Sequence, residues 1–232
     1  MSRLARRLVA DEQMDHPSLD PEVYAAVIGD LARVNALLMV YRPTIAFIRR
    51  TLNGRRRFRL LDVGYGQGDM LRAIARWALP RRVEAELVGI DLNARSLAAA
   101  TAATPPGLPI EYRTGDYAAT AGEGWDYVIS SSTTHHMTDA ELHAFLCFME
   151  GQARLGWYVN DIHRHPLAYW SFPTLARIMG WHPMVREDGC TSIQRGFRKA
   201  DWERLIAQSG IDRAGPKVVR RFPLRLCVER AR

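Results

Sequence analysis

The sequence of 232 residues has little of what several protein classes require. Its three cysteines are scattered and odd in number, which argues against a disulfide framework and a CxxC metal site. It has no run of about 18 uncharged apolar residues, so we expect no membrane span. The first residues, MSRLARRLVADEQMD, show only a broken apolar stretch and no cleavage signature of a signal peptide. We therefore expect a cytoplasmic protein.

Lysine is also nearly absent. Of the 32 Lys and Arg residues, only Lys199 and Lys217 are lysines, and the net charge is +7. The arginines are dispersed, with short groups such as residues 55–57, and no basic stripe alternates with aromatics as in a single-strand binder. We attribute the charge to a solvated face and expect no nucleic-acid partner. Modification of RNA stays open, and it would require steeply salt-dependent RNA binding.

Two helices are expected before the first strand. Asp20 is typical of an N-cap and Pro21 of the first helical position, and apolar residues follow at helical spacing. A second helix is expected to begin at Pro43. We therefore predict an N-terminal helical cap over residues 1–54 and a cofactor-binding domain over residues 55–232.

Strands and helices then alternate along the chain. The expected strands are residues 58–63, 85–91, 110–114, 125–131 and 156–161, and the last helix is followed by a hairpin around Phe222 and Pro223. This order predicts an α/β, Rossmann-like, doubly wound sheet of seven strands. The sheet should be mostly parallel with an antiparallel C-terminal hairpin. Residues 163–198 are the least regular and most aromatic part, and we expect a helical insertion there that covers a substrate.

A glycine-rich turn follows the first strand in LLDVGYGQGD, residues 60–69. Three glycines at a strand-to-helix junction indicate that a ligand approaches the backbone closely. A dinucleotide site of the GxGxxG type needs its third glycine where this chain has Asp69, whose carboxylate would repel a diphosphate. The spacing DxGxGxG suits a ligand with an ammonium and a sulfonium group. A nicotinamide-dependent reductase is therefore disfavoured but remains an alternative.

The turn resembles the first motif of the class I S-adenosylmethionine-dependent methyltransferases. The resemblance covers roughly residues 55–230 and implies S-adenosyl-L-methionine as the cofactor. It assigns Asp62, Gly64, Gly66 and Gly68 to the cofactor turn. It places Asp91, followed by Leu92, on the ribose hydroxyls, and Asp116, followed by Tyr117, at the adenine. The separate alternatives are a plain turn at the glycines, a helix N-cap at Asp91 and a Gly-Asp turn at Asp116.

Histidines follow the fourth and fifth expected strands, whose carboxyl ends should face the transferred methyl group. His135 and His136 follow the fourth strand, and His163 follows the fifth, two residues after Asp161. A histidine can remove the proton of a phenol during methyl transfer. These three are therefore the candidate catalytic bases. Hydrogen bonds to the backbone and a metal site are the alternatives for this histidine group; we expect no metal.

The sequence argues against several methyl acceptors. The segment after the fourth strand, SSSTTHH, lacks the Asn/Asp-Pro-Pro-aromatic run typical of enzymes that methylate amino groups of bases. None of the cysteines lies in the loops where a nucleophile for pyrimidine carbon would be needed.

The sequence resembles small bacterial enzymes of secondary metabolism that methylate quinones, phenols or polyketide-like products. We expect O-methylation of a small aromatic, phenolic or quinol-like metabolite. C-methylation of such a ring and a catalytically silent S-adenosylmethionine-binding protein are the alternatives. A homodimer is compatible with the sequence but not implied by it.

Overall fold

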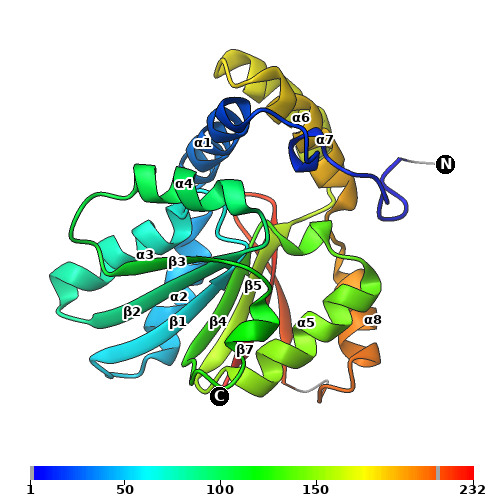
Figure 1. Cartoon of the computed structure of the whole chain (residues 1–232). Helices are drawn as coiled ribbons and strands as arrows, with labels where there is room; N and C mark the ends of the chain where they lie inside the picture. The colour runs from blue at the N-terminus through cyan, green and yellow to red at the C-terminus, as the bar shows by residue number, and fades with distance from the viewer. Residues whose placement is uncertain (1–2, 213–214) are drawn as a thin grey trace.

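A seven-stranded sheet forms the centre of the fold in the computed structural model, which describes residues 3–212 and 215–232 (Figure 1). The strands are β1 (Arg57–Val63), β2 (Glu84–Asp91), β3 (Ile110–Thr114), β4 (Tyr127–Ser131), β5 (Gly156–Ile162), β6 (Lys217–Arg221) and β7 (Arg225–Ala231). Their order in the sheet is β3-β2-β1-β4-β5-β7-β6. Strands β1 to β5 are parallel, and β7 is antiparallel to both β5 and β6. The predicted fold class is confirmed.

Helices cover both faces of this sheet. One face carries α2 (Tyr41–Thr51), α3 (Asp69–Ala78) and α4 (Ala94–Ala103), and the other carries α5 (Asp139–Gln152) and α8 (Lys199–Gln208). Successive side chains of a strand point to opposite faces. Leu60 accordingly packs in the core cluster of α2 and α3, and Leu61 packs in the cluster of α5 and α8.

A third group of helices lies beyond the end of the sheet where β5 leads into α6 (Figure 1). It consists of α1 (Pro21–Leu37), α6 (Pro166–Ile178) and α7 (Pro183–Arg195). These helices share a separate core that includes Val27, Ala176, Trp181 and Val185. Residues from the N-terminus and from the insertion at 163–198 thus build one layer above the strand ends.

The helix starts follow from local chemistry. Asp20 caps α1, as predicted, and Thr138 and Glu141 form the predicted capping box of α5. Helix α2 begins at Tyr41 instead of Pro43. The insertion is more regular than its sequence pattern suggested, because a His-Pro pair starts each helix. The Nδ1 atoms of His165 and His182 accept hydrogen bonds from the first turns of α6 and α7.

No single helix in the described part of the chain is long and apolar enough to cross a membrane. Helices α1 and α2 meet the length and composition of a span only as a pair, which is bent by 63°.

The cap of α1 gives a test of the fold. The Oδ1 atom of Asp20 accepts hydrogen bonds from the amides of Glu22 and Val23. Asp20→Ala leaves both amides without this acceptor and should lower the free energy of unfolding by about 1 kcal/mol in urea denaturation. Asp20→Asn keeps an acceptor oxygen, so its free energy of unfolding should fall much less. Equal losses in the two variants would contradict the capping role.

Candidate active site

A cavity of about 470 Å³ lies between the strand ends and the helices α1, α6 and α7. Its floor comes from the turns that follow β1, β2 and β4, and its roof comes from the three helices. The residues that line the floor include Gly64, Gly66, Asp91, Leu92 and His136. The predicted cofactor turn and two of the three predicted histidines, His135 and His136, therefore meet in one space.

The three glycines of the turn differ in what surrounds them. A Cβ atom on Gly64 would collide with Thr133, and one on Gly68 would collide with Tyr112. A Cβ atom on Gly66, whose φ is +54°, would have nothing within 4 Å. The protein's own packing thus favours glycine at Gly64 and Gly68, whereas a Cβ atom on Gly66 would enter open space.

Three carboxylates surround this turn. Asp91 accepts hydrogen bonds from the amides of Gly66 and Asn93, both at 2.9 Å. Asp69 accepts hydrogen bonds at 2.9 Å from the side chains of Asn35 and Tyr41, which belong to the N-terminal helices. Asp62 is buried at the end of β1, and its Oδ1 has no hydrogen-bond partner in the described residues. This part of the cavity is therefore rich in negative charge.

The pKa values of two of these carboxyls respond to that arrangement. Burial raises the pKa of Asp62 well above its usual range, and the charges of Asp69 and Asp91 raise it further. Burial also raises the pKa of Asp91, although the amides of Asn93 and Gly66 oppose the shift. A cation bound at the turn would lower the pKa values of both carboxyls, because a positive charge favours ionised carboxylates.

The other two residues assigned to the cofactor lie elsewhere. Asp116 is exposed, and its Oδ1 accepts a hydrogen bond from Ala118 at the start of η3 (Tyr117–Thr120). The ring of Tyr117 packs against Phe145 and Phe148 of α5. Neither residue is among the described residues that line the cavity. Their contact with an adenine ring stays a prediction.

Asp161, at the end of β5, holds the turn that carries the histidine pair. This turn is η4 (Thr134–His136). The carboxylate of Asp161 accepts hydrogen bonds from the hydroxyl of Thr134 and from the amide of His135. It also pairs with Nδ1 of His135 at 2.8 Å. Because an ionised carboxylate only accepts, Nδ1 carries the hydrogen and Nε2 points away from Asp161.

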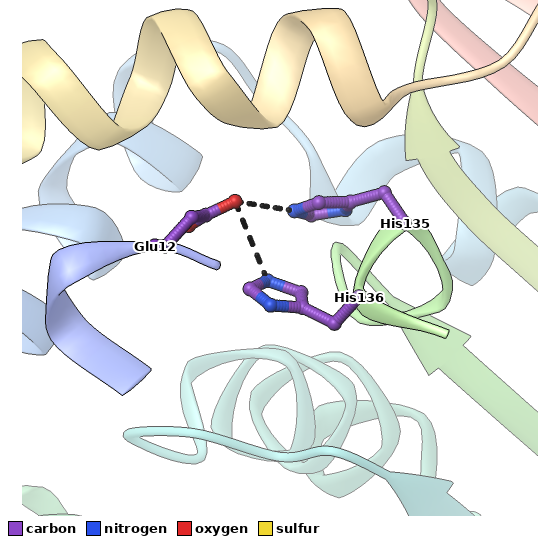
Figure 2. A group of neighbouring side chains, drawn as sticks. All are labelled: Glu12, His135 and His136. Carbon is purple, nitrogen blue, oxygen red and sulfur yellow. Dashed lines mark ion pairs between the residues drawn. The ribbon is translucent and has the colours of Figure 1, made fainter. Parts of the chain in front are cut away.

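Glu12 reaches the histidines from the N-terminal segment (Figure 2). Its Oε1 lies 3.6 Å from Nε2 of His135 and 3.8 Å from Nε2 of His136. Ser192 of α7 donates a hydrogen bond to the same Oε1 at 2.7 Å. Nδ1 of His136 pairs with Asp15 at 2.9 Å. Two histidines and two acids from distant segments thus form one polar cluster.

Burial and charge act in opposite directions on His135. Burial by itself lowers the pKa of this imidazole, but the carboxylates of Asp161 and Glu12 outweigh it and raise the pKa to about 9. The same contacts lower the pKa of Asp161 despite its burial.

Helix α7 fixes the N-terminal segment beside the cluster. Arg195 donates hydrogen bonds to the carbonyl oxygens of His135, His136 and Ala10. Asp188 accepts hydrogen bonds from the amides of Gln13 and Met14, both at 3.0 Å. The polar cluster therefore depends on η4, α7 and residues 10–15 together.

His163, the third candidate base, lies outside this cluster. Its amide donates to Leu224, and it forms an isolated parallel bridge with Phe197. It is buried and is not among the described residues that line the cavity. Burial, together with the positive charges of His165 and Arg220, lowers the pKa of His163 to about 4.

The opposite side of the cavity is apolar. Helix α1 contributes Val27 and Leu31, α6 contributes Phe172 and Leu175, and α7 contributes Val185. Two other aromatic residues of the insertion do not line the cavity. Trp181 packs in the shared core of α1, α6 and α7, and Trp170 is exposed to solvent.

Glu12, Asp15 and Asp69 were not predicted as site residues. A short acidic segment such as residues 11–15 has no spacing that indicates a role, and its contacts with η4 span more than a hundred positions. Asp69 was noted only as a carboxylate that disfavours a diphosphate. Its position within the cavity follows from contacts with α1 and α2.

Comparison with known proteins agrees with this geometry. Residues 60–151 match the methyltransferase domain family. The chain is 29% identical over 160 residues to a ubiquinone biosynthesis O-methyltransferase of Rhizobium rhizogenes. That match covers 66% of this chain and 60% of the relative, so the chain spans less than two thirds of the curated relative's length.

Two solved structures share the fold. The magnesium protoporphyrin IX methyltransferase of Synechocystis PCC 6803, crystallised with bound SAH, has a TM-score of 0.57 at 17% identity. The match covers 95% of this chain and 91% of that one. Human N-acetylserotonin methyltransferase in complex with SAM has a TM-score of 0.63 at 12% identity, covering 92% and 56% of the two chains.

The buried His163 gives a pH-dependent stability test. An unfolded histidine has a pKa of about 6.5, so the unfolded chain takes up a proton between about pH 6.5 and 4 that the folded chain excludes. The neutral ring therefore stabilises the fold above pH 6.5, and this contribution is lost as the pH falls toward 4. In urea denaturation at several pH values, the free energy of unfolding of His163→Asn should fall less between pH 7 and 4.5 than that of the unmodified chain.

The exposed His143 provides a control for that test. His143→Asn should keep the pH profile of the unmodified chain. If His163→Asn kept it too, His163 would not be a buried neutral histidine.

The site also agrees with the comparisons in its details. The glycine turn lies within the matched domain, the overall fold is similar to that of the solved methyltransferases, and the cavity adjoins the turn. Residues 60–151 therefore match a methyltransferase domain, and the comparisons support a class I S-adenosylmethionine-dependent methyltransferase.

Proposed function

We propose that this chain transfers the methyl group of S-adenosylmethionine to a hydroxyl oxygen of a small aromatic metabolite, phenolic or quinol-like. One observation carries the proposal. A single cavity joins an acid-rich glycine turn to an apolar wall and ends at the cluster of Glu12, His135 and His136. These three environments suit a cationic methyl donor, a flat ring and an ionising hydroxyl group.

The glycine turn would hold the cofactor. Its ammonium and sulfonium groups are positive, and the carboxylates of Asp69 and Asp91, which line the cavity, supply negative charge around the turn. The open space at Gly66 leaves room beside the backbone. Residues 1–54 would act as a cap on this end, since Asn35 and Tyr41 hold Asp69 in place.

The apolar wall and the polar cluster would hold the acceptor. Phe172 and Leu175 offer a surface for an aromatic ring, and the cluster faces the same space. Nε2 of His136, whose Nδ1 pairs with Asp15, would accept the hydroxyl proton, and the oxygen lone pair would form the new bond to the methyl carbon. The electron pair of the broken carbon–sulfur bond stays on sulfur, which becomes neutral.

The curated relatives support oxygen as the acceptor atom, because they are named ubiquinone biosynthesis O-methyltransferases. Methylation of a ring carbon would use the same cavity and is the alternative. Transfer of labelled methyl from S-adenosylmethionine to a panel of phenols, catechols and quinols tests the proposal. Fragment masses of the product separate the two atoms. Tight cofactor binding without any transfer would contradict the proposal and indicate a silent member.

Gly66→Ala tests the cofactor end. The substitution places a Cβ in the open space at a positive φ, so we expect about tenfold weaker S-adenosylmethionine binding by calorimetry, a loss of about 1.4 kcal/mol. Gly107→Ala is a matched control, because Gly107 also has a positive φ and nothing within 4 Å of its Cβ but does not line the cavity. Similar binding losses in both variants would mean that backbone strain alone is responsible.

His136→Asn tests the acceptor end. The side chain of His136 lines the cavity, and its Nδ1 pairs with Asp15. We expect kcat to fall at least about a hundredfold, as for other residues that handle a proton, while the Kd for S-adenosylmethionine stays unchanged. His143→Asn should leave both values unchanged. An equal loss of affinity and turnover in His136→Asn would make the residue structural.

A further inference from the structure

Glu12, His135 and His136 turn their reactive atoms toward one another (Figure 2). The Nε2 atoms of both histidines point at Oε1 of Glu12, at 3.6 and 3.8 Å. These separations are too long for hydrogen bonds, which for N–H···O lie near 2.9 Å. The three ligand atoms nevertheless all lie within 4.8 Å of one another. Three ligand atoms at this spacing can all contact one ion placed between them.

The far side of each imidazole is already occupied by a carboxylate. Asp161 pairs with Nδ1 of His135 at 2.8 Å, and Asp15 pairs with Nδ1 of His136 at 2.9 Å. With one hydrogen held on Nδ1, the lone pair forms on Nε2, directed at Glu12, once the ring has lost its second proton. Metal binding releases such a proton from the ligand nitrogen. Metal-binding histidines almost always have this second partner, because it fixes the tautomer and makes the ligand nitrogen more basic.

Glu12 is equally well held. Its side chain is 2% exposed, and Ser192 donates a hydrogen bond to it. Arg195 anchors the backbone on both sides, through the carbonyls of Ala10 and of the two histidines. The ligand set is therefore positioned by residues other than its own members.

We propose that Glu12, His135 and His136 bind one divalent first-row transition-metal ion at the acceptor end of the cavity. Metal–ligand bonds of about 2.1 Å in tetrahedral geometry separate ligand atoms by about 3.4 Å, close to the two observed distances. Two histidines and one carboxylate form a recurring metal-binding set that leaves coordination positions open. All three residues line the cavity, so the open positions face the acceptor.

The ion also gives the acceptor end a chemical role, and this step rests on the proposed function. A hydroxyl oxygen bound to the ion would release its proton to bulk water more readily, because the positive charge lowers the pKa of a coordinated hydroxyl. With the ion bound, Nε2 of His136 is a ligand and does not take this proton. The acceptor would thus bind as an oxyanion aimed at the methyl group. An acceptor with two adjacent hydroxyls fits the open positions better than one with a single hydroxyl.

Titration of the tag-free, EDTA-treated chain with Co²⁺ and Zn²⁺ tests the site. We expect one equivalent of Co²⁺ to bind with visible d–d absorption and to be displaced by Zn²⁺. Glu12→Gln and His136→Asn should each weaken the Kd at least about tenfold. His143→Asn should bind both ions as the unmodified chain does. Absence of binding, or binding that Glu12→Gln and His136→Asn leave unchanged, would overturn the proposal.

Two further readouts separate this proposal from the proposed function. Glu12→Gln should keep the Kd for S-adenosylmethionine, which shows that a loss of metal is not a loss of fold. If these residues bind metal but no phenol is methylated, the metal site is supported and the proposed function is contradicted. If the EDTA-treated chain transfers methyl groups fully and binds no metal on titration, the proposed function is supported and the metal site is contradicted.

Discussion

The carboxylate of Asp161 is the contact on which the candidate site depends. It is fully buried at the end of β5, next to β4 in the sheet, and faces the turn that leaves β4. Hydrogen bonds from Thr134 and from two atoms of His135 fix both the backbone of that turn and the direction of the imidazole. A buried charge is stable only when it is paired, so the sheet and the turn hold each other in one arrangement.

The cavity is closed by segments that are far apart in the sequence. Residues 10–15 lie against η4 and α7, and Arg195 and Asp188 supply the hydrogen bonds that keep them there. Helix α7 belongs to the insertion between β5 and α8, so the polar cluster requires both the N-terminal segment and the insertion. The matched methyltransferase domain, residues 60–151, contains neither of them. The polar cluster therefore combines two histidines of the matched domain with segments that lie outside it.

The fold was predictable because its signals are local. The alternation of strands and helices, the glycine turn, the cap at Asp20 and the capping box at Thr138 each depend on residues a few positions apart. The neighbouring positions of the glycine turn, Asp91 and the histidine pair followed from the rule that parallel strands end at one edge of the sheet.

Contacts between distant segments were not predictable in the same way. Nothing in residues 11–15 indicates that Glu12 meets His135, since that contact depends on how α7 folds over the sheet. His163 follows a strand end as His135 does, but its place beside Phe197 buries it away from the cavity. The helical spacing of the insertion also did not separate Phe172, which lines the cavity, from the exposed Trp170.

The most direct measurement is a crystal structure of the chain with S-adenosylhomocysteine and a catechol. We expect the cofactor product along the glycine turn near Gly66, the ring against Phe172, and a hydroxyl oxygen at the polar end formed by Glu12, His135 and His136. A ring bound in the reverse direction, with its hydroxyl groups among the apolar side chains of α1 and α6, would rule out the proposed transfer to a hydroxyl oxygen at this cluster.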